Sequence, residues 1–387
     1  MQPKKEREYL VAICVSLTTF TLYVKTLHPS LPGGDSGELV VAAHELGVSH
    51  PPGYPLFTLL SVLALHLVPV GSPVWRVNLL SAFLGASTSG VVYLLIYRLT
   101  KSLGAGCLGV AMFSLSRLVW VWSCVAEVFS LNNLMLALLM LTAVHFDTLE
   151  ERTMKQMAYI GAFLCGLCLS NQHTSVLYIV FLVPWVMFRL WNAKLLSFAL
   201  LVKLTLLFML GLSPYLYLPV SSAVNKARWT WGDQSSLNGF LRHLLRQEYG
   251  TWDLLKDHRG QGFVSGILSY SSHVARDLSV PVSVLAVLSL WSTSYRYKVS
   301  KSSVLAVFTG MLIAYITFFC WRANLDIGNP LFFKVVERFW IQSDLVLSVL
   351  AAVSFDDFCR FISHRFRALS WYHLDILLMM PLFAWQL

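Results

Sequence analysis

The chain has 387 residues, of which 56% are hydrophobic and 13% charged, and its formal net charge is +9. Soluble domains carry about 25% charged residues, so this composition excludes an ordinary soluble protein and predicts an all-α polytopic membrane protein. The positive charge fits basic cytoplasmic loops. Since no basic-aromatic motif for RNA or DNA is present, we expect no nucleic-acid partner.

Ten apolar runs are long enough to predict membrane spans. They cover residues 9–27, 77–98, 104–124, 129–146, 157–170, 174–188, 196–218, 279–293, 303–320 and 339–354. A further run, 54–70, is bounded by prolines and contains His66. If this run does not cross, every short basic loop shares a side with the basic N-terminus, which is then cytosolic. We therefore predict that 54–70 lies at the interface and that residues 28–76 form one luminal segment.

The first luminal segment contains LPGGDSGELVVAAHELGVSHPPGYPLF, residues 31–57. Asp35 and Glu38 are spaced as in a capping box, in which both residues satisfy the first turn of a helix. The glycines around Asp35 also suggest that a ligand comes close to the backbone, and a helix N-terminus favours an anion nearby. Both roles are compatible, because a capped helix fixes the position of its carboxylate.

The stretch SHPPGYP, residues 49–55, predicts a stiff turn, since three prolines fix φ and Gly53 permits a positive φ. The turn either links two interfacial helices or presents His50 and Tyr54 to a ligand. Further along the chain, Glu127 and His173 lie where apolar runs end. Each of them either serves as a cap or turn residue or faces a substrate.

The segment NKARWTWGDQSSLNGFLRHLLRQEYG, residues 225–250, combines aromatic and basic residues. Trp231 offers a ring face for a sugar or acceptor, and Arg228 offers a guanidinium for a phosphate. Residues 237–249 predict an amphipathic helix on the luminal surface, with Leu241, Leu244 and Leu245 towards the bilayer or the bundle. Arg338 is the other candidate for the phosphate, with an interfacial ion pair to Glu337 as the alternative.

All of these polar stretches fall on the luminal side of the predicted topology, which is the arrangement that a membrane-embedded active site requires. We expect one transmembrane catalytic domain over residues 1–355, with the luminal segments 28–76 and 220–277. A basic and apolar tail, 356–387, follows. The seven cysteines lie mostly in apolar runs, and we expect neither zinc nor redox chemistry nor any other metal site.

The stretch GGDSGELVVAAHELGVSHPPGYPL, residues 33–56, resembles the signature of the transmembrane protein 260 family, polytopic GT-C-type O-mannosyltransferases. The stretches AEVFSLNN, NQHT and WGDQSSLNGFLRHLLRQEYG resemble its later motifs in the right order. The resemblance implies a GT-C-like bundle with luminal interfacial helices, in the endoplasmic reticulum membrane. It also implies dolichyl-phosphate mannose as a lipid-linked donor, no further cofactor, and Ser/Thr of folded receptor domains, the immunoglobulin-like domains of plexin-type receptors, as acceptor.

Carried over to this sequence, the resemblance makes Asp35 the catalytic base and Glu38 the second acid of an inverting mannosyl transfer. The substrate-binding candidates are His50, Tyr54, Glu127, His173, Arg228, Trp231 and Arg338. Family members continue into a luminal helical-repeat region, so we expect this chain to be a shortened form. Two other interpretations stay open: a lipid or solute transporter or flippase, and an inactive membrane protein that binds partners or lipid.

Overall fold

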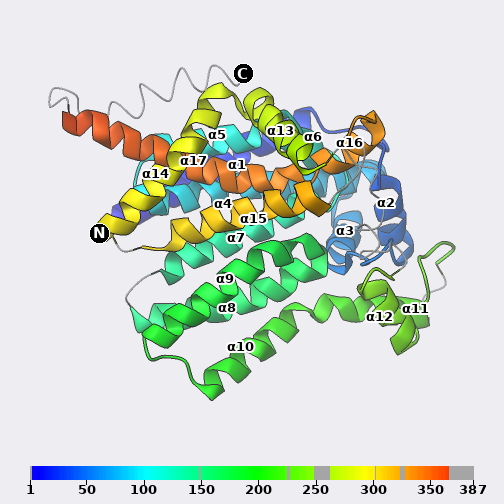
Figure 1. Cartoon of the computed structure of the whole chain (residues 1–387). Helices are drawn as coiled ribbons and strands as arrows, with labels where there is room; N and C mark the ends of the chain where they lie inside the picture. Colours follow the sequence, from blue (N-terminus) through cyan, green and yellow to red (C-terminus); the bar gives the residue numbers. More distant parts are fainter. Residues whose placement is uncertain are drawn as a thin grey trace.

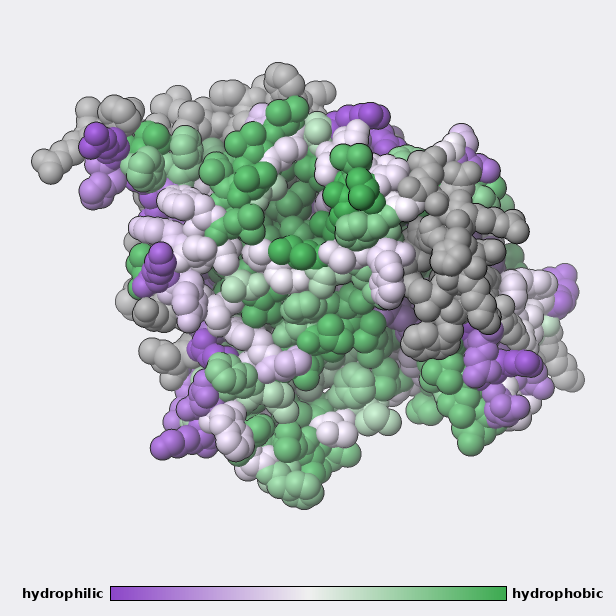
Figure 2. Space-filling model, viewed as in Figure 1, coloured by the Kyte–Doolittle hydropathy of each residue, from purple (hydrophilic) through white to green (hydrophobic). Residues whose placement is uncertain are grey.

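A computed structural model describes residues 2–147, 150–224, 227–247, 262–300, 302–322 and 327–365. Every regular element within these ranges is a helix, and the long helices lie side by side in one bundle (Figure 1). On the face seen in Figure 2, apolar residues cover the middle and hydrophilic residues gather towards the two ends. An apolar belt between polar ends is what a bundle that crosses a bilayer requires.

Each of the ten predicted spans coincides with a long helix or with a bent pair of helices. These are α1 (Gln2–Lys25), α4 (Pro73–Thr100), α5 (Leu103–Ser114) with α6 (Arg117–Ser123), α7 (Phe129–Phe146), α8 (Glu151–Asn171), η1 (His173–Ser175) with α9 (Val176–Asn192), α10 (Phe198–Gly211) with η2 (Ser213–Leu216) and α11 (Tyr217–Val224), α14 (Val280–Ser300), α15 (Val304–Arg322) and α17 (Trp340–Arg365). Among the described residues, five helices are long and apolar enough to cross a membrane, or up to eight if each bent pair is one span. Helices α8 and α17 are long enough but are not among these, because their residues are more polar on average.

The shorter helices fill the predicted luminal segments. They are α2 (Ser36–Glu45), α3 (Pro55–Leu67), α12 (Leu237–Leu244), α13 (Phe263–His273), η5 (Val274–Leu278) and α16 (Pro330–Glu337). Helices α2, α3, α12 and α16 lie at the end of the bundle opposite the start of α1 (Figure 1). This arrangement brings the polar stretches of the sequence to one end.

Helix α17 lies inside the bundle, and every residue from Trp340 to Asp357 is buried. It packs against α5, α14 and α15, so its apolar residues face protein on all sides. The expected tail begins within this helix, which continues through residues 356–365. Residues 366–387 lie outside the described ranges.

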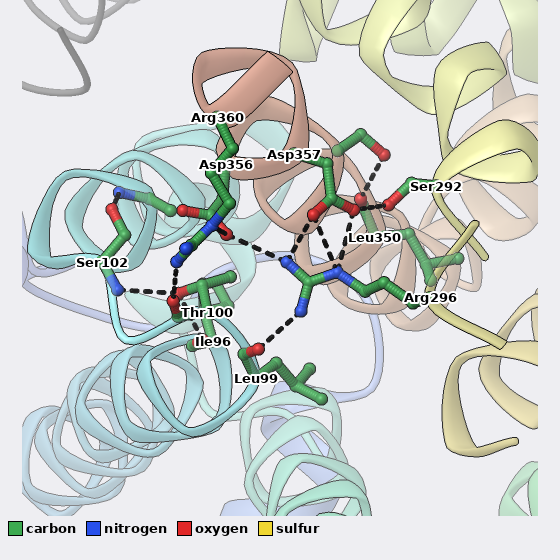
Figure 3. Close-up of polar contacts among 12 residues, drawn as sticks. Ile96, Leu99, Thr100, Ser102, Ser292, Arg296, Leu350, Asp356, Asp357 and Arg360 are labelled. Atoms are coloured by element: carbon green, nitrogen blue, oxygen red, sulfur yellow. Dashed lines mark hydrogen bonds and ion pairs between the residues drawn. The ribbon is translucent and has the colours of Figure 1, made fainter. Parts of the chain in front are cut away.

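A cluster of four charged residues closes the bundle at the end where α4 stops (Figure 3). This charged clasp consists of Arg296, Asp356, Asp357 and Arg360. Arg296 Nη1 and Arg360 Nη2 each also donate a 2.6 Å hydrogen bond, to the carbonyl oxygens of Leu99 and Thr100 respectively. The last carbonyls of a helix have no partner within it, so the two arginines satisfy the C-terminal end of α4.

Helix α12 confirms an amphipathic element in the large loop, but the predicted end at residue 249 is wrong. The helix stops at Leu244, because Arg246 adopts a left-handed conformation with φ of 55°. Leu241 and Leu245 are 41% and 57% exposed, whereas Leu244 packs against the cluster around Val48. Residues 248–249 lie outside the described ranges.

Helix α3 has 13 residues, so it is about 20 Å long, and the hydrocarbon core is about 30 Å thick. We therefore predict that it lies at the interface and that Ser72, at the start of α4, is luminal. In a variant without the native cysteines, an impermeant thiol reagent should label Ser72→Cys from the lumen and Lys101→Cys, at the other end of α4, from the cytosol. Labelling of Ser72→Cys from the cytosol would contradict this topology.

Candidate active site

Asp35 directly precedes α2, yet its side chain makes no capping hydrogen bond. Its Oδ2 instead accepts a 2.9 Å hydrogen bond from Arg338 Nη1, and the side chain remains 34% exposed. Glu38 does not complete a capping box either, because its carboxylate points to His50. The capping-box interpretation is therefore wrong: a residue far along the chain engages Asp35, which also stays accessible to a ligand.

The glycine before Asp35 brings the backbone close to Glu127. Gly34 has φ of +81°, which side chains rarely adopt, and a Cβ there would lie 3.6 Å from Glu127 Oε1. A Cβ at Gly33 would meet nothing within 4 Å. The backbone thus approaches Glu127 on one side and leaves open space on the other.

Arg338 lies between α16 and α17 and is enclosed by aromatic rings. Its Cζ is 6.0, 5.6 and 5.8 Å from the ring centroids of Trp122, Phe129 and Phe339. Such contacts attract a guanidinium and fix its plane. The Nε of Arg338 is buried and meets no hydrogen-bond acceptor within the described part of the chain. The rings thus hold the guanidinium in a fixed place beside Asp35, with one of its donors unsatisfied by the described residues.

Glu127 is the second carboxyl group at Arg338, with Oε1 3.8 Å from Nη1. It lies between α6 and α7 and is 1% exposed. Burial raises the pKa of Glu127 to about 8, the negative charge of Asp35 adds to the rise, and Arg338 opposes it. At neutral pH most Glu127 is thus protonated, and the site combines a carboxylate, a guanidinium and a neutral acid.

This raised pKa predicts a pH-dependent stability. Glu127 binds its proton more tightly in the folded state, so its contribution to stability is present below pH 4.5 and is lost as pH rises to about 8. Glu127→Gln keeps the neutral form at every pH. The melting temperature of wild type should therefore fall more steeply between pH 5 and 9 than that of the variant. Equal slopes for the two proteins would show that Glu127 is ionised in the folded protein.

Glu38 orients the imidazole of His50. Glu38 Oε1 accepts a hydrogen bond from the backbone N–H of His50 and lies 2.9 Å from Nδ1, and His50 Nε2 lies 3.1 Å from the hydroxyl of Tyr54. Because a carboxylate only accepts, we infer that Nδ1 carries the proton and that Nε2 accepts from Tyr54. The ring of Trp231 lies 6.5 Å from that of His50. The structure thus brings four of the predicted residues together in one hydrogen-bonded and aromatic group.

Tyr54 joins this group to the charged one. Burial raises the pKa of its phenol, the positive charge of Arg246 opposes that rise, and Glu127 and Asp35 add to it. Arg246 falls within the predicted helix 237–249, but its left-handed backbone lies just beyond the end of α12. Gly53 has φ of +90° as predicted, and Tyr54 itself has φ of 41°, a strained backbone of the kind found at ligand sites.

Two predicted residues lie apart from this centre. His173 Nε2 is 2.8 Å from the hydroxyl of Tyr215, in the turn between α8 and α9. Arg228 is 90% exposed and binds Glu45, which ends α2 about 15 Å along the helix from Asp35. Of the two arginines expected to compete for a phosphate, only Arg338 contacts the catalytic candidate.

In the described ranges no group of three or more His, Cys, Asp or Glu side chains is placed to hold a metal ion. The centre built by Asp35, Glu127 and Arg338 offers acid–base groups and an anion site. It is suited to a reaction in which a hydroxyl loses a proton while an anionic group is held.

Comparison with known proteins bears on this centre. The model of the Protein O-mannosyl-transferase TMEM260 N-terminal domain matches residues 35–196. Protein O-mannosyl-transferase TMEM260 of Mus musculus is 51% identical over 347 residues, which is 88% of this chain and 49% of the mouse protein. The Dictyostelium discoideum protein of the same name is 35% identical over 364 residues, 88% of this chain and 43% of that protein. The chain thus spans about half the length of the curated relatives that it matches.

Solved structures with a similar fold are also polytopic membrane proteins. ArnT from Cupriavidus metallidurans bound to undecaprenyl phosphate has a TM-score of 0.63 at 14% identity, over 90% of this chain and 60% of ArnT. The Archaeoglobus fulgidus oligosaccharyltransferase complex with Zn and sulfate has a TM-score of 0.53 at 14% identity, over 97% and 53%. These similarities confirm the predicted fold class, an all-α GT-C-like membrane bundle.

Proposed function

The chain belongs to the TMEM260 family of protein O-mannosyl-transferases, and on that premise we propose that it transfers mannose to a protein hydroxyl. The observation that carries the proposal is the pair of Asp35 and Arg338: an accessible carboxylate bound to an aromatic-enclosed guanidinium. The proposed donor is dolichyl-phosphate mannose. The proposed acceptor is Ser or Thr of folded extracellular domains, the immunoglobulin-like domains of plexin-type receptors, in the endoplasmic reticulum.

In this proposal Asp35 accepts the proton of the acceptor hydroxyl while the hydroxyl oxygen attacks the anomeric carbon of mannose. The new bond forms on the face opposite the bond that breaks, so the configuration inverts. The lipid phosphate leaves as a stable anion, and no strong general acid is needed. Holding both substrates in a closed site contributes much of the rate.

Arg338 would bind the phosphate in both the bound donor and the transition state. Its Nη1 already contacts Asp35, but a guanidinium carries five N–H donors, so donors remain for phosphate oxygens. The protonated Glu127 beside it adds no negative charge that would repel the phosphate. ArnT, which shares the fold, was solved with a lipid phosphate, which supports a donor of that class.

The group of Glu38, His50, Tyr54 and Trp231 would bind the sugar or the acceptor. Glu38 acts through His50, whose ring it orients, so we assign it a positioning role within the proposal. Trp231 offers a ring face next to that imidazole. In this proposal Asp35 is the base, Arg338 binds the phosphate, and these four residues form a polar and aromatic surface for the sugar or the acceptor.

The experiment that tests this function is mannosyl transfer by the purified chain in lipid nanodiscs. Dolichyl-phosphate mannose would be the donor and a folded immunoglobulin-like receptor domain the acceptor. We expect hexose on Ser or Thr of the acceptor, detected by mass spectrometry, and none with Asp35→Asn. A well-folded chain that binds the lipid phosphate but never transfers sugar would favour the inactive, lipid-binding interpretation.

A further inference from the structure

A second group of charged residues lies next to Arg338 and is not used by the mechanism. This junction network consists of Arg117, His273, Asp277, Glu337 and Asp344. Its members come from α6, α13, η5, α16 and α17. They come from three separate stretches of the sequence, at 117, 273–277 and 337–344, and of the five only Glu337 figured in the predictions. Charged side chains inside a membrane bundle are costly, so their convergence requires an explanation.

The contacts form one continuous chain. Arg117 Nη2 lies 3.1 Å from Glu337 Oε2 and 3.3 Å from Asp277 Oδ2. Asp277 Oδ2 lies 3.4 Å from His273 Nδ1, and His273 Nε2 lies 2.7 Å from Asp344 Oδ2. Tyr270 donates a 3.3 Å hydrogen bond to the other oxygen of Asp344. Each carboxylate therefore has a cation or a donor beside it.

Three members of the network are buried, Asp277 is partly buried and Arg117 is 57% exposed, and its two basic residues face three carboxylates. Asp344 is 0% exposed, His273 7% and Glu337 8%. Both ring nitrogens of His273 lie within 3.4 Å of carboxylate oxygens, and two carboxylates so close favour the imidazolium form. Replacing one member of such a buried network leaves its partners uncompensated. The arrangement thus fixes the elements that carry it in one relative position.

The element so fixed is the link between α16 and α17, residues 337–340, which carries Arg338. Glu337 binds Arg117, and Arg338 binds Asp35. The carbonyl of the next residue, Phe339, accepts a 3.0 Å hydrogen bond from Tyr315. The ring of Trp340 then packs 5.1 Å from that of His273. The network therefore secures the backbone on both sides of Arg338.

We propose that the junction network positions Arg338 against Asp35, and that Arg117 is its key member because it contacts both Asp277 and Glu337. The network residues contact no substrate in this account; they act through Arg338. The inference rests on the proposed function only in taking Arg338 as the group that binds the lipid phosphate. Buried ion pairs are weak contributors to stability, whereas they do fix geometry, which is what a phosphate site needs.

The test measures binding of a short-chain polyprenyl phosphate to the purified chain in nanodiscs, without any turnover. Arg117→Gln should raise the dissociation constant about tenfold, and Arg117→Lys, which keeps a cation, should restore part of the affinity. Arg117 is 57% exposed, so its replacement should leave the bundle folded. Glu337→Gln provides a second variant that breaks the same contact from the other side. The matched control is Arg189→Gln, which removes an ion pair to the 4% exposed Asp147 at the far end of α7.

The decisive measurement repeats Arg117→Gln in an Arg338→Gln background. If the network acts through Arg338, the second substitution should change the dissociation constant by less than about twofold there, because the shared effect is already lost. The proposal is overturned if Arg117→Gln raises the dissociation constant about tenfold in that background as well. It is also overturned if Arg189→Gln raises the dissociation constant as much as Arg117→Gln does. If the binding pattern holds but the chain transfers no mannose, the inference stands and the proposed catalytic function fails.

Discussion

Replacing Asp35 by Asn should lower the rate of mannosyl transfer by about 10²–10⁴-fold, because Asn cannot accept the proton of the acceptor hydroxyl. The structure indicates that this substitution removes the base and leaves the surrounding contacts in place. The Asp35 side chain makes no capping hydrogen bond, so the start of α2 loses nothing when the charge is removed. The amide oxygen can still accept from Arg338 Nη1 at the same position. Initial rates with saturating donor and acceptor would measure the effect, and an unchanged melting temperature would confirm the fold.

Glu38→Gln is the companion substitution to Asp35→Asn. Gln keeps an acceptor for the backbone N–H and the ring of His50, so the orientation of the imidazole should largely survive. We expect a loss of no more than about tenfold, which is smaller than the contribution of a general base. A folded Asp35→Asn protein with near-normal transfer would place the chemistry on another residue, and Glu38 would be the first to test.

Replacing Arg338 by Gln should raise the KM for the lipid donor and reduce kcat/KM by roughly 10²-fold or more. Losing one partner of a partly buried charge pair costs about 2–5 kcal/mol, and each 1.4 kcal/mol is about tenfold. Here the loss leaves Asp35 and Glu127 without their shared cation. The pKa of Glu127 should rise further, since the positive charge of Arg338 is the largest of the effects that lower it.

Separate variation of donor and acceptor concentrations tests the assigned role of Arg338. The KM for the acceptor should stay within about twofold, while Arg338→Lys, which keeps the charge but loses the planar fork, should lie between wild type and Arg338→Gln. The same Arg189→Gln control reports on general loss of an ion pair. If Arg338→Gln raised the KM for the acceptor instead, Arg338 would belong to the acceptor site.

The spans and the first luminal motif could be predicted because both are local patterns. An apolar run has a fixed length in a bilayer, and a glycine such as Gly53 reports its own backbone conformation. At Asp35 and Glu38 the local pattern predicts a capping box, and this prediction is wrong. Their spacing matches a capping box, yet each binds a partner outside the first turn, and the partner of Asp35 is 303 residues away. Tertiary contacts override a weak local preference in both cases.

The residues that sequence reasoning missed share a different property. Arg117 and Asp344 are single charges within apolar stretches, and nothing in their neighbours says which other charge each will meet. Their one signal is that an ionisable residue in such a stretch needs a partner inside the protein. Arg246 differs from them: it lies within the predicted helix 237–249, and nothing in that regular pattern indicates the left-handed residue beyond the end of α12.

The charged clasp has a consequence for how the chain is made. Helices enter the membrane in order as the ribosome delivers them, so α4 and α14 are in place before α17 is synthesised. Until then Arg296 has neither Asp356 nor Asp357 beside it, and the carbonyl of Thr100 lacks Arg360. The early helices therefore form a provisional assembly in which the end of α4 has only part of its final contacts. Helix α17 supplies both carboxylates and the second arginine, so these contacts become complete only when α17 packs into the bundle.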